Sequence, residues 1–364
     1  MANEILTAIG LMSGTSMDGI DAAVLRTDGE RIEGFGPSLS IPYETVFRDR
    51  LRTVLGRNPT DDSDASAVAE DLTGYHIQAV QKLISENGVD PGSVDVIGFH
   101  GHTVFHQPDQ GITRQIGDGG RLARETGISV VCDFRANDVA YGGQGAPFAS
   151  LYHAALSWNY EKPLAVLNIG GVANVTWISP DGGLIAFDTG PGNALIDDWV
   201  REHELGEMDL GGHLAHDGQV DEDALAQLLD NAYFAQLYPK SLDRDDFDPS
   251  PVVNLSIADG AATLTAFSVR AIEKAVHLLP ALPNRWLVCG GGRHNPAIMA
   301  ALRMILIQPV EPVEMAGWQG DALEAQAFAF LAVRSLKALP LSLPSTTGVS
   351  KPVSGGVLHR PDEG

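Results

Sequence analysis

The sequence of 364 residues contains few cysteines, few basic residues and no long apolar run. Its two cysteines, Cys132 and Cys289, each end a short apolar stretch, which predicts buried free thiols of a reducing compartment rather than a disulfide. A membrane-spanning helix needs about 18 apolar residues, and no run approaches that length. The first residues also lack the basic and apolar regions of a signal peptide. We therefore expect a cytoplasmic protein without a membrane partner.

The charge is strongly one-sided. Lys and Arg number 24 and Asp and Glu number 47, so the formal net charge is −23. A chain this acidic is repelled by nucleic acid and by anionic membranes, and neither is expected as a partner. The negative net charge does not exclude a small anionic ligand, because glycine-rich loops and helix N-termini are locally positive. The 44% hydrophobic residues are typical of a folded protein, and the length favours two domains.

A pattern of strand, glycine-rich turn and strand occurs twice. The segment 6–25 predicts two strands around the Gly/Ser/Thr loop 13–19, and the segment 164–178 predicts two strands around Gly170 and Gly171. A P-loop or a dinucleotide fingerprint would require a helix after the first loop, so both are excluded, and with them a dehydrogenase. We interpret the pattern as an internal duplication of two α/β halves.

The remaining periodicity predicts further strands and helices. Strands are expected at 31–41, 94–99, 128–134, 184–187 and 285–289. Helices are expected at 61–87, 194–203, 221–237, 263–279, 297–304 and 321–337. For residues 338–364, which are rich in Pro, Ser, Thr and Gly, an ordered tail and a frayed end are both open.

Four glycine-rich elements follow predicted strands, at 13–19, 168–171, 188–193 and 290–295. Glycine lets a backbone approach a ligand closely and present its N–H groups to phosphate oxygens. Each element alone is explained better by an ordinary turn. Together they favour a polyphosphate site, in which the hydroxyls of Ser13, Thr15 and Ser16 would be further donors and residues 290–292 would contact an adenosine or an α-phosphate.

Three carboxylates are candidates for chemistry. Asp188 stands at a strand tip before a helix and suits a general base, with a turn or cap residue as the alternative. Asp18 could orient Mg²⁺ at the phosphates, or it could bond its own backbone as a turn residue. Glu324 lies on the predicted helix 321–337, and its pattern alone favours an ordinary solvated residue.

His100, His102 and His106 suggest zinc, but no cysteine cluster accompanies them, so polar contacts of His100 and Thr103 to a substrate are favoured. Arg135 could bind a carboxylate with two hydrogen bonds, and a structural Asp–Arg pair is an equally good interpretation.

These segments together resemble the anhydro-N-acetylmuramic acid kinase family over nearly the whole chain. The resembling stretches are 11–21, 99–103, 115–117, 133–135, 142–147, 167–171, 187–193, 289–292 with Asn295, 324–329 and 341–348. The resemblance implies the superfamily of actin, heat-shock ATPases and sugar kinases. The expected fold is therefore α/β, with two duplicated actin-like (ribonuclease H-like) domains and an ATP cleft between them. We expect residues 1–135 with 338–364 in the first domain and 136–337 in the second.

The resemblance also implies a reaction. Water would open the 1,6-anhydro ring of 1,6-anhydro-N-acetylmuramic acid while O6 accepts the γ-phosphoryl group of ATP, giving N-acetylmuramic acid 6-phosphate and ADP. Asp188 matches the family's catalytic base, and Glu324 matches a residue beside the sugar and the water. The resemblance implies ATP as the co-substrate and Mg²⁺ as the metal. It also implies a role in peptidoglycan recycling and amino-sugar catabolism.

The remaining site residues follow from the same motifs. Nucleotide contacts are expected from Ser13, Gly14, Thr15, Ser16, Met17, Asp18, Gly19, Ile20, Gly170, Gly171, Gly290, Gly291, Gly292 and Asn295. Asp18 would hold Mg²⁺. Sugar contacts are expected from Thr103, His100, Arg135, Gly190 and Asn193.

Two other functions are compatible with the glycine loops. One is a kinase of the same superfamily for another sugar or small acid, which a comparison of acceptors would reveal. The other is a non-metabolic actin-like ATPase or scaffold, whose slow ATP hydrolysis would not respond to sugar. A homodimer and a monomer are both open.

Overall fold

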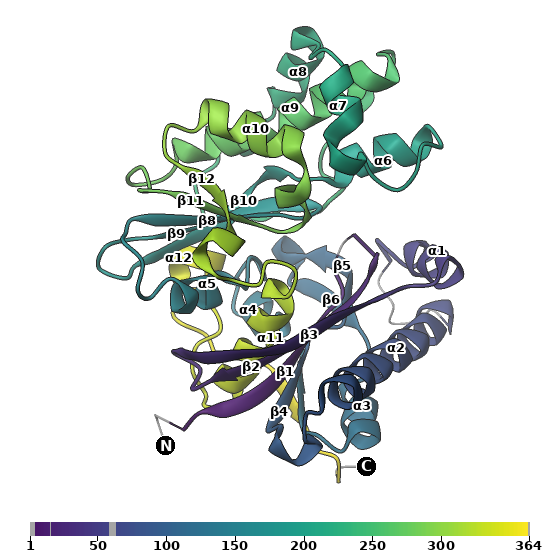
Figure 1. Ribbon diagram of the computed structural model, residues 1–364, viewed down its shortest axis with the longest axis vertical. Helices are drawn as coiled ribbons and strands as arrows, with labels where there is room; N and C mark the ends of the chain where they lie inside the picture. Colours follow the sequence, from purple (N-terminus) through teal and green to yellow (C-terminus); the bar gives the residue numbers. More distant parts are fainter. Residues whose placement is uncertain (1–3, 15, 58–62, 363–364) are drawn as a thin grey trace. The chain divides into compact units, whose positions relative to one another are not determined.

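The computed structural model describes residues 4–14, 16–57 and 63–362, which form two compact units (Figure 1). The first unit comprises Met1–Trp158 and Ala322–Gly364, and the second comprises Asn159–Asp321. The second unit is therefore one continuous segment inserted into the first. In the described part of the chain, no helix is long and apolar enough to span a membrane.

The first unit is built on a sheet of six strands. These are β1 (Leu6–Met12), β2 (Gly19–Thr27), β3 (Ile32–Pro42), β4 (Val96–Phe99), β7 (Val130–Cys132) and β13 (Val357–His359), in the order β13-β7-β4-β1-β2-β3. β1, β2 and β3 form an antiparallel meander, while β4 is parallel to β1 and β7 is parallel to β4. β13 adds an antiparallel edge strand, so the C-terminal segment contributes an ordered strand to this sheet.

The second unit repeats this topology. Its strands are β8 (Leu164–Ile169), β9 (Val172–Ile178), β10 (Leu184–Pro191), β11 (Trp286–Cys289) and β12 (Val310–Pro312), in the order β10-β9-β8-β11-β12. The first three again form an antiparallel meander, and β11 and β12 continue in parallel from β8. The same strand order in both sheets confirms the predicted pair of duplicated actin-like α/β halves. The expected ATP cleft between them stays a prediction.

Helix α11 (Leu323–Leu336) packs on β1, β2 and β4 of the first sheet. A Cβ atom at Gly10 would lie 1.7 Å from the Ala325 carbonyl oxygen, and one at Gly98 would lie 2.1 Å from that of Phe328. Glycine at these two strand positions therefore allows the helix to approach closely. The units divide at Trp158/Asn159 and Asp321/Ala322, whereas boundaries at 135/136 and 337/338 were predicted. The second difference arises because α11 packs on the sheet of the first unit.

A second long helix of the first unit also contacts its sheet. α2 (Ser63–Asn87) contacts β2, β3 and α3 (Gly119–Thr126), and its predicted apolar positions Val68, Leu72, Ile77 and Val80 are buried. Shorter elements complete this unit: α1 (Thr45–Thr53), α4 (Ala136–Ala140), α5 (Ser150–Leu156), α12 (Pro344–Thr347), and the hairpin of β5 (His102–Gln107) and β6 (Ile112–Ile116).

In the second unit, α9 (Ile257–Val276) is the central helix and packs on β10. It begins before the predicted residue 263, because the Ser256 hydroxyl caps it by accepting from the Asp259 N–H. α6 (Ala194–Glu202), α7 (His213–Asp217), α8 (Glu222–Leu229) and α10 (Pro296–Ile305) pack beside it. The helix predicted over 221–237 is too long: it ends at Leu229, and the Asn231 side chain starts a 3₁₀ turn by accepting from the Tyr233 N–H.

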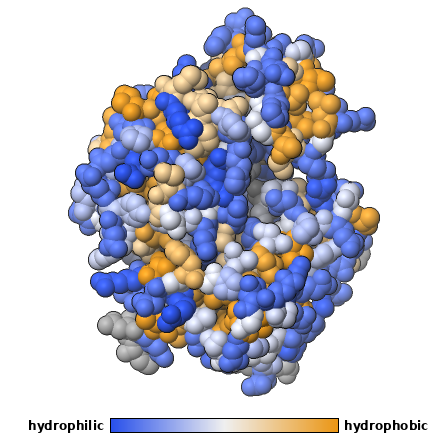
Figure 2. Space-filling model, viewed as in Figure 1, coloured by the Kyte–Doolittle hydropathy of each residue, from blue (hydrophilic) through white to orange (hydrophobic). Residues whose placement is uncertain are grey.

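The structure also tests the strand predicted at 128–134 and the two cysteines. The strand predicted over 128–134 ends at Cys132, because Asp133 takes a φ of 53° and turns the chain. Cys132 and Cys289 are buried free thiols, as predicted. Figure 2 shows hydrophilic side chains over much of the visible face, with smaller apolar areas between them, which suits a chain of charge −23.

Candidate functional site

Two glycine-rich elements of the second unit are joined by backbone hydrogen bonds. The carbonyl of Gly170 accepts from the Asn193 N–H at 2.8 Å, and that of Gly171 accepts from the N–H groups of Gly192 at 2.8 Å and Ala194 at 3.2 Å. A Cβ at Gly192 would lie 2.1 Å from the Gly170 oxygen, so only glycine fits there. The turn between β8 and β9 is thus fixed against the loop that starts α6.

The third glycine-rich element of this unit is the turn after β11, and it packs against the end of β8. Gly290 has a φ of 74°, and a Cβ there would lie 2.4 Å from Asn168 Oδ1. A Cβ at Gly292 would lie 2.4 Å from Ile169 Cγ2. The structure therefore brings together the loops 168–171, 188–193 and 290–292, which their separation in the sequence could not show. Asn295 instead caps α10, with Oδ1 accepting from Ala297 N–H at 3.0 Å.

Asp188 lies at a bulge of β10 and is only 4% exposed. Its Oδ2 accepts from the Leu242 N–H at 2.9 Å, and its backbone carbonyl accepts from the Tyr233 hydroxyl. Burial lowers the pKa of the neighbouring Lys240 to about 8, and the negative charge of Asp188 opposes that shift. The Lys240 ammonium donates to the Tyr233 carbonyl at 2.9 Å. Asp188 is therefore a carboxylate held in one orientation beside a cation.

The two sugar-contact candidates near Asp188 are packed within the protein. A Cβ at Gly190 would lie 2.5 Å from Ala271 Cβ on α9, so this glycine makes room for the helix. Asn193 donates from Nδ2 to the Ile169 carbonyl at 3.1 Å. Their proposed contacts to a sugar stay predictions.

Arg293 follows the glycine turn and is almost fully buried. It donates to the Gly290 carbonyl at 2.9 Å, to Glu314 Oε1 at 2.8 Å and to Asp321 Oδ1 at 2.6 Å. Hydrogen bonds to charged groups are among the stronger ones, so this side chain fixes the turn. Arg293 was not predicted from the sequence, because its acidic partners lie 21 and 28 residues away.

In the first unit, the loop after β1 contains buried and exposed side chains. Ser13 is 1% exposed, and the side chains of Met17 and Ile20 belong to the hydrophobic core. Ser16 and Asp18 are exposed, and the Ser16 hydroxyl donates to Asp18 Oδ1 at 2.8 Å. Thr15 lies outside the described residues. The exposed hydroxyl of Ser16 and the exposed carboxylate of Asp18 are thus accessible to a ligand. The Ser13 hydroxyl instead contacts other side chains of the protein.

Gly14 and Gly19 shape this loop through the backbone. The Gly14 carbonyl accepts from the Met17 N–H at 3.0 Å, which closes a turn. A Cβ at Gly19 would lie 2.3 Å from the Ile41 carbonyl oxygen, so β2 starts tightly against β3 only with glycine there.

His100 and Arg135 contact each other. Arg135 Nε donates to His100 Nε2 at 3.1 Å, while His100 Nδ1 bonds to the Gly101 carbonyl at 2.9 Å. Burial lowers the pKa of His100 well below its usual range, and the Arg135 guanidinium adds to that shift. His100 is therefore neutral, with Nδ1 protonated. Arg135 also donates to the Gly145 carbonyl, and its contact to a substrate carboxylate stays a prediction.

The three histidines of this region face different partners. Gly101, with a φ of 70°, turns the chain between His100 and His102, so the two do not share one strand. His106 bonds to Thr113 Oγ1 at 3.0 Å and to the Gln144 carbonyl at 2.9 Å. Thr103 Oγ1 accepts from Gln115 Nε2 at 3.1 Å. Among the residues that the structure describes, no group of three His, Cys, Asp or Glu could hold a metal.

Glu324 lies in the first turn of α11 and is half-buried. The N-terminal end of a helix favours a carboxylate, because the helix dipole is positive there. Glu324 and Asp188 belong to different units, and their joint role stays a prediction.

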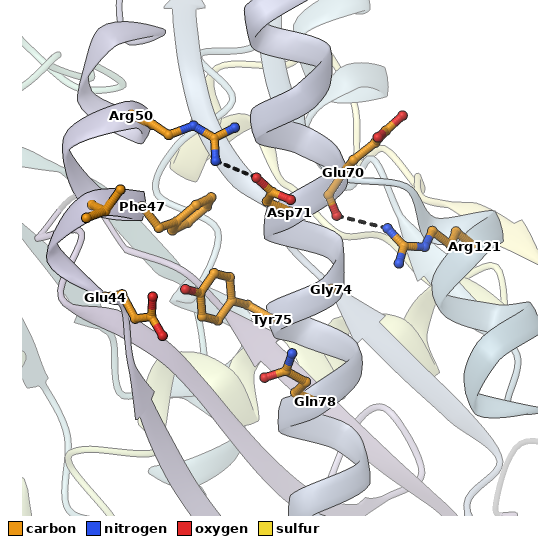
Figure 3. A pocket seen from close by; sticks show the side chains of 10 residues that line it. Glu44, Phe47, Arg50, Glu70, Asp71, Gly74, Tyr75, Gln78 and Arg121 are labelled. Atoms are coloured by element: carbon orange, nitrogen blue, oxygen red, sulfur yellow. Dashed lines mark hydrogen bonds and ion pairs between the residues drawn. The ribbon is translucent and has the colours of Figure 1, made fainter.

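A polar hollow of about 550 Å³ lies beside α1 and α2 of the first unit (Figure 3). Both of its arginines are bonded within the protein: Arg50 Nη1 lies 2.6 Å from Asp71 Oδ2, and Arg121 Nη1 donates to the Glu70 carbonyl at 2.9 Å. The lining residues are Glu44, Val46, Phe47, Arg50, Glu70, Asp71, Gly74, Tyr75, Gln78 and Arg121. None of the predicted site residues lines it.

Comparison with known proteins gives one family. The family model described as "Anhydro-N-acetylmuramic acid kinase" matches residues 6–361. Relatives of that name include proteins from Rhodospirillum rubrum (53% identical, covering 96% of this chain and 93% of that protein), Paramagnetospirillum magneticum (52%, 98% and 100%) and Acidiphilium cryptum (54%, 97% and 98%). Among solved structures, component A of (R)-2-hydroxyglutaryl-CoA dehydratase from Acidaminococcus fermentans matches with a TM-score of 0.47 at 12% identity, covering 90% of this chain and 99% of that one.

Proposed function

Because the chain belongs to the anhydro-N-acetylmuramic acid kinase family, we propose that it couples hydrolysis of the 1,6-anhydro ring of 1,6-anhydro-N-acetylmuramic acid to phosphorylation of O6 by ATP. The chain is a kinase that uses ATP and transfers a phosphoryl group to an alcohol. The proposed products are N-acetylmuramic acid 6-phosphate and ADP. This reaction would return an amino sugar of peptidoglycan to metabolism.

The position of Asp188 is the observation that carries the proposal. Ring opening requires a base that activates water on the face opposite the bridge, as in an inverting glycosidase. Asp188 is buried, and the Leu242 N–H orients its Oδ2. It also follows β9 and the Gly170-Gly171 turn in the same meander. We assign water activation to this carboxylate.

The departing O6 needs no separate acid in this scheme, because the γ-phosphoryl group captures the charge that develops on it. Phosphoryl transfer depends mainly on positioning and on neutralising charge. We assign positioning of the phosphates to Gly14, Ser16 and Gly19 in the first unit and to Gly170 and Gly171 in the second. The turn Gly290–Gly292 is assigned to the nucleoside end of ATP.

Mg²⁺ would fit beside Asp18. Mg²⁺ in kinases is commonly held by one or two carboxylates, with phosphates and water completing its shell. Asp18 is exposed, and its Oδ1 is already oriented by the Ser16 hydroxyl at 2.8 Å. When bound, the metal would neutralise charge on the transferring group. Glu324, in the first turn of α11, is assigned to the sugar and the attacking water.

The test is a coupled assay of ADP release with four acceptors: 1,6-anhydro-N-acetylmuramic acid, N-acetylmuramic acid, glucose and acetate. We expect turnover with the anhydro sugar far above the other three. A preference for any of the others would overturn the assignment of the substrate. Release of ADP at one rate with and without every acceptor would indicate a simple ATPase instead.

The hydrolytic step needs its own readout. The reaction is run in water enriched in heavy oxygen, and the product is analysed by mass spectrometry after fragmentation. We expect one heavy oxygen atom at C1 and none at O6, because water attacks the anomeric carbon while O6 stays with the sugar. Phosphorylated product that still contains the anhydro bridge would refute coupled ring opening.

A further inference from the structure

Tyr43 holds both ends of the loop that follows β1. Its hydroxyl lies 2.7 Å from Ser13 Oγ at the start of the loop, and its backbone N–H donates to the Asp18 carbonyl at 2.9 Å near the end. His102 contacts the same serine, with Nδ1 2.9 Å from Ser13 Oγ. Ser13, Tyr43 and His102 are 1%, 7% and 1% exposed, so these contacts are closed to water.

Burial fixes the protonation states of Tyr43 and His102. Burial raises the pKa of the Tyr43 hydroxyl well above its usual value, so it stays protonated. Burial lowers the pKa of His102 to about 4, so its ring is neutral at physiological pH. The Ser13 hydroxyl then lies between a phenol and a neutral imidazole, which can donate to it or accept from it. Its 1% exposure leaves no surface for a ligand oxygen.

Tyr43 is itself held by packing. Its ring centroid lies 5.0 Å from that of Phe47 on α1 and 5.3 Å from that of Tyr75 on α2. Phe47 and Tyr75 lie next to each other at the wall of the polar hollow (Figure 3). Aromatic rings at these separations stabilise one another beyond simple burial. The Tyr43 hydroxyl is thus presented to Ser13 from a rigid base.

We propose that Tyr43 and His102 are positioning residues that hold Ser13, and through it the backbone of residues 14–18, in the conformation that receives the phosphates of ATP. Ser13 is an anchor of the loop and does not donate to a phosphate. The inference rests on the proposed assignment of this loop to ATP. Neither Tyr43 nor His102 touches the substrate in this scheme.

The first test compares Tyr43→Phe with Tyr75→Phe. Each removes one phenolic hydroxyl from the same aromatic cluster, but only Tyr43 contacts Ser13. Tyr43→Phe removes one of the two hydrogen bonds that hold Ser13, so we expect it to weaken binding of a non-hydrolysable ATP analogue about 3- to 10-fold in calorimetry. Tyr75→Phe should stay within about twofold, as should the KM for the anhydro sugar in both variants. Equal effects of the two variants would overturn the proposal.

A double-substitution cycle separates an anchor from a ligand. If Ser13 acts through Tyr43, Ser13→Ala should reproduce Tyr43→Phe, and combining the two should add little. A loss with Ser13→Ala that is far larger, and additive with Tyr43→Phe, would mean that Ser13 contacts phosphate directly. His102→Asn, which keeps a polar atom near the position of Nδ1, should recover part of the affinity that His102→Leu loses.

Hydrogen exchange tests the loop without ATP. In wild type, the amide of Met17 is bonded to the Gly14 carbonyl and that of Tyr43 to the Asp18 carbonyl. We expect faster exchange of these two amides in Tyr43→Phe and His102→Leu, with unchanged exchange in β8. Unchanged exchange at both amides would overturn the proposal even if ATP proves not to be the substrate. Wild type that fails to bind the ATP analogue would refute the proposed function alone.

Discussion

Arg293 and Asp321 form an ion pair of 2.6 Å between Nη2 and Oδ1, although the side chain of Arg293 is 3% exposed and that of Asp321 is 77% exposed. The same guanidinium also donates to the Gly290 carbonyl and to Glu314. One buried side chain therefore connects the glycine turn after β11 to the last residue of the second unit.

Replacing Arg293 by Met should reduce stability and weaken ATP binding. The change removes the hydrogen bonds that hold the Gly290 turn, and we expect a loss of about 1–2 kcal/mol in the free energy of unfolding, moderated because both carboxylates are partly solvated. Urea unfolding and calorimetry with an ATP analogue would measure the two effects. Arg270→Gln, which breaks an exposed pair with Glu273, is the matched control and should cost less than about 0.5 kcal/mol. Similar losses in the two variants would contradict a special role for Arg293.

Asp188→Asn should fold normally and lose most of its turnover. The amide can still accept from the Leu242 N–H, but it cannot take a proton from water. General base catalysis commonly contributes about 10²- to 10⁴-fold, so we expect kcat to fall within that range while binding of the anhydro sugar is largely kept. The same change at the exposed Asp181, in the turn between β9 and β10, is the control. Near wild-type kcat for Asp188→Asn would remove Asp188 as the base.

Acid should destabilise the protein well before its carboxylates are protonated. Burial lowers the pKa values of His76, His102 and His106 to about 4, against an ordinary value of 6.5. The unfolded chain therefore binds more protons between these values, and stability that is complete above pH 6.5 is lost as the pH falls towards 4. Each group contributes up to about 1.4 kcal/mol per pH unit in this range.

Urea midpoints at a series of pH values would measure this loss. His76→Phe keeps a ring against Phe99 and removes one titrating group, so its stability should depend less steeply on pH than that of wild type. Stability that is independent of pH between 7 and 5 would show that these imidazoles take up protons in the folded protein over the same pH range as in the unfolded chain.

Gly192→Ala and Gly74→Ala should change stability in opposite directions. The new methyl at 192 would lie 2.1 Å from the Gly170 oxygen, so the turn and the loop would separate at a cost of about 3 kcal/mol. Gly74 lies inside α2, where a Cβ would have no atom within 4 Å, and alanine should stabilise the helix by about 0.8 kcal/mol. Thermal unfolding of the two variants would measure both changes in stability. A Gly192→Ala variant as stable as wild type would mean that the loop at Gly192 is not tightly packed against the Gly170 turn.

The meanders and their glycine turns could be predicted because their signal is local: the apolar stretches on both sides of Gly170 and Gly171 lie within one short segment. Asp188 could be singled out for the same reason, since it directly follows the apolar stretch 184–187, although β10 continues past it to Pro191. The side chains that orient these groups could not be found. Tyr43 and His102 are 30 and 89 residues from Ser13, and Leu242 is 54 residues from Asp188. Their own neighbours in the sequence carry no sign of these contacts.

The assignment of residues 322–337 to the second domain failed for a related reason. The pattern of α11 predicts a helix with an apolar face, but not which sheet that face covers. The matching signal is the pair Gly10 and Gly98, whose missing side chains make space for the helix on β1 and β4. Glycine within a strand is a sign of close backbone approach, but nothing near it in the sequence names the partner.

The insertion of the second unit also sets an order of events during synthesis. A ribosome completes every residue of Asn159–Asp321 before it makes α11 and β13. Until then, β1 and β4 present Gly10 and Gly98 with no helix over them, and β7 lacks its outer neighbour. We expect the inserted unit to reach its native state first on the nascent chain, because the first unit needs α11 and β13, which are made after it.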